Sequence, residues 1–113
     1  MQSFAKIAMN ASVNYTILID QYLENAIEID VDLIRDQDGK IFIAGIMEHI
    51  EEAGIHSGDS GCSLPPFSIK TDIEDQIVVW VTKIAHKINV IGLMNVQLAL
   101  KDSQLYVLEV NPR

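Results

Sequence analysis

The sequence predicts an α+β fold in which a helix packs on one face of an antiparallel β-sheet. Apolar and acidic residues alternate over residues 27–33, as in a strand with one buried face. Apolar residues recur at helical spacing over residues 71–89. Two further alternating runs, 94–100 and 106–110, predict a closing hairpin. We therefore expect a sheet of about four strands with one helix-covered face and a second face that carries any site.

Length, composition and charge limit what the chain can do. A length of 113 residues corresponds to one domain or to part of a larger one. The composition, with 49% hydrophobic and 21% charged residues, is typical of a globular protein. The net charge of −8 argues against binding to nucleic acid or an anionic membrane surface. No apolar run approaches the about 20 residues of a membrane span. Cys62 is the single cysteine and no signal-like segment begins the chain, so we predict a cytoplasmic protein.

The first half of the chain predicts a helix, an extended run and a hairpin. Residues 1–14 carry apolar side chains at helical spacing, and residues 15–23 are rich in β-formers. The alternating strand over 27–33 is followed by Asp36-Gln37-Asp38-Gly39, which is typical turn chemistry. Residues 40–50 then resume an extended pattern, so two antiparallel strands are expected.

The middle of the chain predicts a long irregular loop and then the main helix. Residues 54–67 contain three glycines and two prolines. After this loop, Thr71 and Glu74 fit a capping box, and Asn89 with Gly92 can end the helix. The predicted buried stripe consists of Ile73, Ile77, Trp80, Val81, Ile84 and Ile88.

Matching the apolar faces of the closing hairpin predicts its register, because cross-strand partners share a face. This register needs an odd number of turn residues centred on Ser103. It places Gln97 opposite Glu109, and Asn95 opposite Asn111, on the face away from the core. The apolar pairs are Leu100 with Tyr106, Leu98 with Leu108, and Val96 with Val110.

Gln97, Glu109 and Asn111 would then present three oxygen donors on one sheet face. A carboxylate and two amides suit Mg²⁺ or Mn²⁺ that keeps water and shares phosphate oxygens. The alternative is that these are ordinary polar residues on a solvated face. The sequence has no Walker-type loop and little positive charge, so a triphosphate would need cations from the metal or from other sequence.

Other candidate residues also have two interpretations. Glu28, Asp30 and Asp32 are either the wet face of a strand or a source of one acid for a ribose hydroxyl. His56 lies in the glycine-rich loop and is either a ligand contact or incidental. His49 lacks the partners of a zinc site and is interpreted as structural.

Four stretches together resemble the large subunits of carbamoyl-phosphate synthase, a family of ATP-grasp ligases. These stretches are Glu28–Asp32, Gly45–Ser60, Asn95–Gln97 and Glu109–Arg113. The resemblance covers roughly residues 15–113 and is closest to the second half of that family, which phosphorylates carbamate. It implies an ATP-grasp C-terminal subdomain, with the earlier subdomain and its Gly-rich flap absent. The chain is therefore expected to be a fragment, inactive alone, with residues 1–113 forming part of an ATP-grasp domain.

The resemblance also implies roles for single residues. Gln97, Glu109 and Asn111 match the divalent-metal ligands, and Gln97 and Glu109 also contact ATP. Arg113 matches an arginine that meets a phosphate or the acid substrate in catalysis. The nucleotide contacts implied by the resemblance are Gln21, Leu23, Glu28, Gly54, Ile55, His56 and Ser57.

The implied reaction partners are ATP with Mg²⁺ or Mn²⁺, carbamate, the remainder of the large subunit and a small glutamine-hydrolysing subunit. Two alternatives remain at the level of sequence. One is a non-catalytic acidic module that only pairs with other chains. The other is part of a different ATP-grasp ligase that phosphorylates another carboxylate.

Overall fold

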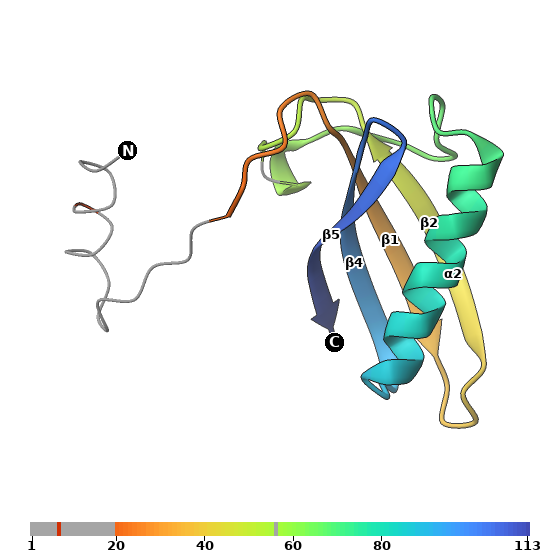
Figure 1. Cartoon of the computed structure of the whole chain (residues 1–113). Helices are drawn as coiled ribbons and strands as arrows, with labels where there is room; N and C mark the ends of the chain where they lie inside the picture. The colour runs from red at the N-terminus through yellow and green to blue at the C-terminus, as the bar shows by residue number, and fades with distance from the viewer. Residues whose placement is uncertain (1–6, 8–19, 56) are drawn as a thin grey trace.

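The computed structural model describes residue 7, residues 20–55 and residues 57–113. Within them, five strands form one antiparallel sheet in the order β3-β2-β1-β4-β5, and the helix α2 crosses one face of it (Figure 1). This confirms the predicted α+β fold, with one strand more than expected. The elements are β1 Ile27–Arg35, β2 Ile41–His49, the 3₁₀ turn η1 Ser57–Asp59, β3 Cys62–Ser63, α2 Thr71–Lys87, β4 Gly92–Lys101 and β5 Gln104–Pro112.

Two predicted elements at the start of the chain are not carried into this architecture. The expected helix over residues 1–14 lies outside the described residues, apart from Ile7. Most of the extended run over residues 15–23 is also outside them, and its described part, residues 20–23, is not in a strand.

The core lies between α2 and the central strands β1 and β4. Ile29, Val31 and Leu33 of β1 are at most 1% exposed, and they pair with three equally buried residues of β4. Because side chains alternate along a strand, this burial directs every second residue of β1 to the opposite face. The helix and β4 residues that complete this core are Ile77, Val81, Ala85, Met94, Val96 and Leu98.

The hydrophobic stripe of α2 is mostly confirmed. Ile77 and Val81 are fully buried, and the half-buried Ile73, Trp80 and Ile84 pack against the core. Ile88 is wrong as a core residue, since it is 46% exposed beyond the end of the helix. The small side chain of Ala85 is buried instead, where α2 lies close to the sheet.

The N-terminus of α2 corrects the predicted capping box. The N-cap residue is Lys70, and no side chain caps the helix. The backbone N–H groups of Ile73 and Glu74 both donate to the carbonyl oxygen of Lys70, at 3.0 Å each. Thr71 is therefore already inside the first turn, where it cannot act as the cap.

As predicted, Asn89 terminates α2: the helix ends at Lys87 with Ile88 as its C-cap, and Asn89 follows directly. This residue has φ +52°, a left-handed conformation that asparagine tolerates better than most residues. The N–H groups of Asn89 and Val90 donate to the carbonyls of His86 and Ala85, at 3.1 and 3.2 Å. Gly92, the second predicted terminator, instead begins β4 with φ +111°.

The first hairpin forms as predicted. Asp36 to Gly39 make the turn between β1 and β2, with Gly39 at φ +85°. The N–H of Asp36 donates to the carbonyl of Lys40 at 3.0 Å, and the carboxylate of Asp36 accepts the N–H of Lys40 at 2.8 Å. The aspartate side chain thus closes the turn that its type suggests.

The loop over residues 54–67 contains the extra strand. Cys62 and Ser63 form β3, which pairs with His49 and Glu48 at the end of β2. Sequence reasoning treated this loop as irregular, because a two-residue strand leaves no periodic pattern to detect.

The closing hairpin keeps the predicted pairing at the site but not at the turn. Lys101 pairs with Gln104, so the turn has two residues, Asp102 and Ser103, with φ +50° and +63°. Positive φ at both positions is the backbone of a tight hairpin turn. The expected odd-numbered turn is therefore wrong. So are the pairs Leu100 with Tyr106 and Leu98 with Leu108, which are replaced by Leu100 with Leu105 and Leu98 with Val107.

A β-bulge at Leu108 restores the register beyond that point. Leu98 pairs with Val107 and Gln97 with Glu109, so Leu108 has no partner across the ladder. Val96 then pairs with Val110, and Asn95 with Asn111, as predicted. If all residues were kept and the ladder ran on without the bulge, the two-residue turn would place Glu109 opposite Val96, facing α2.

Glu48 joins the sheet to the loop that precedes α2. It pairs with Ile29 on the helix-covered face and is only 2% exposed. Its carboxylate accepts the N–H groups of Phe67 and Ser68, at 2.9 Å each, and the hydroxyl of Ser68. A buried carboxylate is tolerated here because backbone and hydroxyl donors surround it.

We predict that Glu48→Gln lowers the free energy of unfolding by about 2 kcal/mol. In this variant an NH₂ group replaces one carboxylate oxygen, and it cannot accept the hydrogen bonds that the surrounding N–H and O–H groups donate. Urea unfolding followed by circular dichroism measures this. The matched control is Asp75→Asn on the exposed face of α2, which should change stability by less than about 0.5 kcal/mol. Equal midpoints for the two variants would contradict the role given to Glu48.

Candidate functional site

The face of the sheet opposite α2 carries two adjacent rows of polar residues. These rows cross β1, β4 and β5, which are neighbours in the sheet. Cross-strand partners on one face lie about 5 Å apart at Cβ, so each row is a set of neighbours. The rows are Asp32, Asn95 and Asn111, and Asp30, Gln97 and Glu109. The predicted juxtaposition of Gln97, Glu109 and Asn111 is therefore confirmed.

A cavity of about 600 Å³ opens over these rows. Gln97, Asn111 and Arg113 line it together with Asp30, Asp32 and Asn95, whereas Glu109 lies beside it as the partner of Gln97. The N–H of Arg113 donates to the carbonyl of Leu93 at 2.8 Å, which extends the ladder and holds Arg113 at this face. The remaining lining residues are Ala44, Met47, Gly58, Cys62, Leu93 and Met94.

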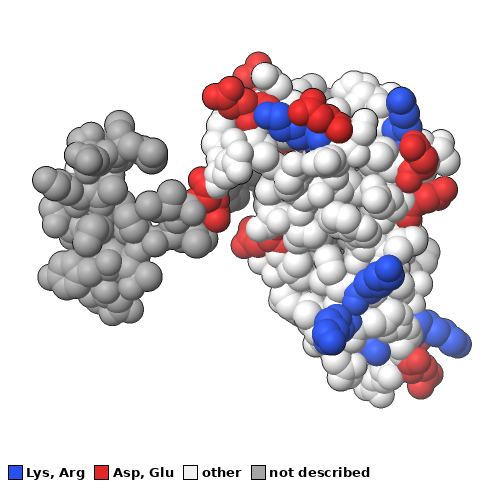
Figure 2. All heavy atoms as spheres, in the orientation of Figure 1, with Lys and Arg blue, Asp and Glu red and all other residues white. Residues whose placement is uncertain are grey.

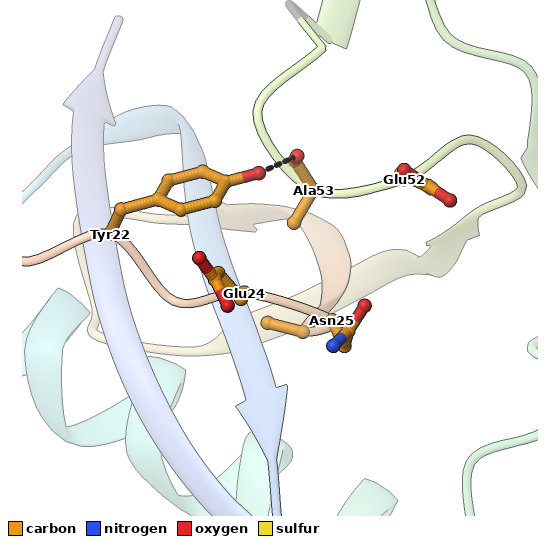
Figure 3. A pocket seen from close by; sticks show the side chains of 6 residues that line it. Tyr22, Glu24, Asn25, Glu52 and Ala53 are labelled. Atoms are coloured by element: carbon orange, nitrogen blue, oxygen red, sulfur yellow. Dashed lines mark hydrogen bonds between the residues drawn. The ribbon is translucent and has the colours of Figure 1, made fainter.

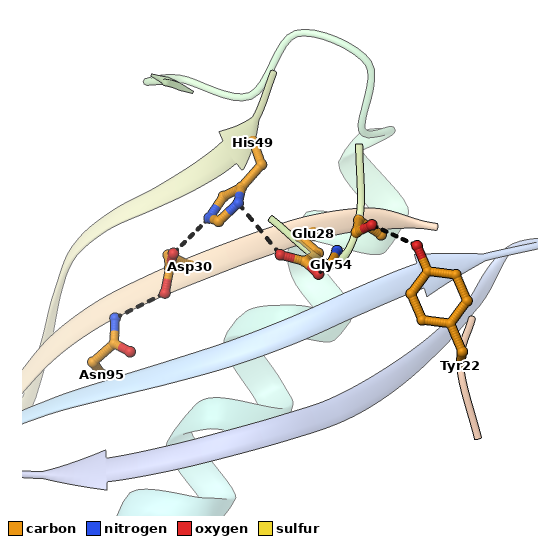
Figure 4. A network of polar contacts seen from close by, with 7 residues as sticks. Tyr22, Glu28, Asp30, His49, Gly54 and Asn95 are labelled. Carbon is orange, nitrogen blue, oxygen red and sulfur yellow. Dashed lines mark hydrogen bonds and ion pairs between the residues drawn. The ribbon is translucent and has the colours of Figure 1, made fainter. Parts of the chain in front are cut away.

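A buried histidine connects the acids of β1 (Figure 4). His49 Nε2 lies 2.6 Å from Oδ2 of Asp30, and His49 Nδ1 lies 3.5 Å from Oε2 of Glu28. His49 and Asp30 are 7% and 8% exposed. A carboxylate accepts hydrogen bonds, so Nε2 is the ring nitrogen that carries a proton and donates it in the hydrogen bond to Asp30. The structural interpretation of His49 holds, but its partners are on β1 and not among its sequence neighbours.

The same network reaches the glycine-rich loop. Oε1 of Glu28 accepts the backbone N–H of Gly54 at 2.8 Å. Gly54 has φ +97°, a backbone conformation that side chains with a Cβ rarely adopt. Glu28 and Gly54, both predicted nucleotide contacts, are thus in direct contact. Ile55 follows and is 41% exposed, Ser57 begins η1, and His56 lies outside the described residues.

A second pocket of about 370 Å³ lies next to this loop (Figure 3). The hydroxyl of Tyr22 donates to the carbonyl of Ala53 at 2.7 Å and closes one side of it. Gln21 and Leu23, which the resemblance implies as nucleotide contacts, are not among the lining residues, whereas Tyr22 and Glu24 are. The lining is completed by Asn25, Ala26 and Glu52.

The donor set fits a nucleotide-borne divalent cation better than a cation held by protein alone. Among the described residues, no three His, Cys, Asp or Glu side chains are grouped to hold a metal ion. The predicted set has one carboxylate, Glu109, and two amides, Gln97 and Asn111. Hard oxygen donors of low total charge suit Mg²⁺ or Mn²⁺ that takes its other ligands from water and phosphate.

Positive charge is scarce around both pockets. Arg113 is the one Lys or Arg that lines either of them in the described part of the chain. On the side of the molecule in Figure 2, many of the other cations gather at the end that holds the β1–β2 turn and the end of α2. The negative charge of a triphosphate would therefore need cations beyond those that these residues provide.

Solved structures place this architecture in a class. The biotin carboxylase domain of Hydrogenobacter thermophilus 2-oxoglutarate carboxylase, in complex with MgADP, ADP and bicarbonate, matches with a TM-score of 0.77. The match covers 99% of this chain and 25% of that one at 18% identity. Biotin carboxylase from Campylobacter jejuni matches with a TM-score of 0.71, at 19% identity over 99% of this chain and 25% of its own. The fold is that of ATP-grasp domains.

Sequence relatives define the family. The family model described as "Carbamoyl-phosphate synthase L chain, ATP binding domain" matches residues 1–113. The chain is 49% identical to the carbamoyl phosphate synthase large chain of Synechocystis over 113 residues, and 50% identical to that of Neisseria meningitidis over 114. The chain therefore belongs to the carbamoyl-phosphate synthase large-chain family. Both alignments include 100% of this chain but only 10% of the length of the relative.

No helix in the described residues has the length and hydrophobicity needed to cross a membrane.

We predict that Gly54→Ala destabilises the chain by about 1–2 kcal/mol, because a side chain at φ +97° is strained. The new Cβ would also lie 3.2 Å from the ring and hydroxyl of Tyr22. Chemical denaturation measures the effect. Gly61→Ala is the matched control, since its Cβ would meet Glu51 at an ordinary 3.6 Å. A similar loss in both variants would contradict the special role of Gly54.

We also predict that Cys62 reacts slowly despite its exposure. Partial burial raises the pKa of its thiol above the ordinary value, and the carboxylates of Asp30 and Glu51 raise it further. A raised pKa means less thiolate at neutral pH, so the rate of alkylation should rise only at higher pH. The rate of iodoacetamide labelling against pH tests this. Asp30→Asn should move the profile part of the way back, whereas Asp32→Asn should leave it in place.

Proposed function

We propose that the polar face of the sheet binds ATP with a divalent cation and serves the phosphorylation of carbamate within a large chain of carbamoyl-phosphate synthase. The carrying observation is the pairing of Gln97 with Glu109 and of Asn95 with Asn111 above one cavity. Identity of 47–50% to large chains over 97–100% of this sequence favours this reaction over phosphorylation of another carboxylate. Residues 1–113 then form part of an ATP-grasp domain.

Each residue has a distinct task in this proposal. Gln97, Glu109 and Asn111 hold Mg²⁺ or Mn²⁺ by their side-chain oxygens, and the metal neutralises charge on the phosphates. Arg113 lines the same cavity, where its positive charge would meet a phosphate or the acid substrate. These four residues position the metal, the phosphates and the acid substrate, and none of them acts as a nucleophile.

The nucleoside lies nearer the glycine-rich loop. We place it by the second pocket, with Gln21 and Leu23 beside Tyr22, and with Gly54, Ile55, His56 and Ser57 as the loop contacts that the family resemblance implies. Glu28 holds Gly54 through its N–H and has a second oxygen available to a ribose hydroxyl or to His49.

The reaction balances without further reagents. An oxygen of carbamate attacks the γ-phosphorus of ATP, and the bond from that phosphorus to the β–γ bridging oxygen breaks. Carbamoyl phosphate and ADP leave. Clamping of the triphosphate from the other side, and the supply of carbamate, come from the remainder of the large chain and a glutamine-hydrolysing small subunit in the cytoplasm.

We expect nucleotide binding to need Mg²⁺ or Mn²⁺ and to weaken at least tenfold in Glu109→Gln, because that change removes the one carboxylate of the donor set. Isothermal titration of ATP into the chain, with and without Mg²⁺, measures this. Asp102→Asn is the matched control, since it removes one acid from the turn of the same hairpin.

Two outcomes would count against the proposal. Equal nucleotide affinity with and without Mg²⁺ would remove the role of the metal. An absence of nucleotide heat at any Mg²⁺ concentration would favour a non-catalytic acidic module.

A further inference from the structure

Asn95 is held by two carboxylates at once. Its side-chain nitrogen donates to Oδ1 of Asp32 at 2.9 Å and to Oδ1 of Asp30 at 3.2 Å. An asparagine amide has two N–H donors, and ionised carboxylates can only accept. Both donors are therefore committed, and the chemistry of the partners fixes which end of the amide faces them.

The orientation of the amide leaves its oxygen on the other side. In Figure 4 the nitrogen of Asn95 is the end of the amide that faces Asp30, and the oxygen is the other end. Asn95 lines the cavity, and its cross-strand partner on β5 is Asn111. Asn95 thus lies on the same sheet face as the proposed donors Gln97, Glu109 and Asn111, and its amide oxygen is the end that does not face the two acids.

One of the two acids that fix Asn95, Asp30, is itself fixed. Asp30 is 8% exposed and uses its second oxygen to bind the ring of His49. His49 is anchored in turn by its place in β2, next to β1 in the sheet. A chain of buried and half-buried hydrogen bonds therefore orients one amide at the surface of the cavity before a ligand arrives.

We propose that Asp30 and Asp32 are positioning residues that lock Asn95 so that its amide oxygen accepts a hydrogen bond from a water molecule on the bound cation. Mg²⁺ and Mn²⁺ in such sites keep several waters, and each water donates outward. Groups that orient this outer layer tune metal affinity. The inference rests on the proposed function, because it assumes that Gln97, Glu109 and Asn111 hold the cation.

The locking itself can be measured without any metal. Exchange of the side-chain NH₂ protons of Asn95 with solvent, followed by NMR, should be at least tenfold slower than exchange at the exposed Asn25 and Asn89. Asp32→Asn should bring Asn95 close to these two. Equal exchange rates at all three asparagines in the unmodified chain would overturn the inference.

The effect on the cation is measured by electron paramagnetic resonance of Mn²⁺ in the presence of ADP. Asn95→Leu removes the amide oxygen without changing the charge, and Asp32→Asn releases the amide. Both should raise the dissociation constant of Mn²⁺ by about 10- to 100-fold. Asp38→Asn, in the β1–β2 turn, controls for the loss of one negative charge and should have no effect.

The outcomes separate the two proposals. If the unmodified chain binds Mn²⁺ with ADP, and the Asn95 and Asp32 variants bind equally well, the inference fails while the proposed function stands. If the unmodified chain binds no Mn²⁺ with ADP, the proposed function fails and so does the role given to Asn95. The melting temperature of each variant shows whether weaker binding of Mn²⁺ results from unfolding. If Asn95→Leu proves to be unfolded, the test relies on Asp32→Asn, which keeps the side-chain volume.

Discussion

Burial of one face of β1 under α2 is the constraint on which the site depends. Ile29, Val31 and Leu33 are removed from water, and burial of side chains of this size contributes about 1.5–3 kcal/mol each. A shift of β1 by one residue would expose all three, so its orientation is firmly set. The acids between them have no alternative to the other face. The hydrophobic core thus decides where the polar chemistry lies, although it contributes no polar group to it.

Sequence patterns predicted the parts of the molecule that repeat. The alternation in β1 and the stripe of α2 each follow from a period that many residues share, and the turn from Asp36 to Gly39 follows from residue types that are typical of turns. Single contacts were not predictable in this way. At the start of α2, the backbone carbonyl of Lys70 accepts the first hydrogen bonds and no side chain caps the helix. In the closing hairpin, Asp102 and Ser103 adopt a left-handed backbone conformation, although neither is a glycine.

The candidate site was predicted in its members more than in its connections. The juxtaposition of Gln97 and Glu109 followed from matching apolar faces, although the turn that was assumed was wrong. The contact between His49 and Asp30 could not be found, because it depends on the register between β1 and β2. Ala44 of β2 is unpaired in that ladder, opposite Asp32 and Leu33, and this bulge shows no sequence signal. The resemblance to a family implied that Gln97, Glu109 and Asn111 are metal ligands, whereas their position as neighbours was predicted from the register of the hairpin.

The bulge at Leu108 has an evolutionary consequence. Loss of this one residue would let β5 follow the tight turn as an unbroken ladder, and Glu109 would still lie across from Gln97. Relatives that differ by a single deletion between the turn and this glutamate can therefore keep the same ligand geometry. Sequence comparisons of this segment should be aligned on the glutamate and the following Asn-Pro, with any gap placed ahead of them.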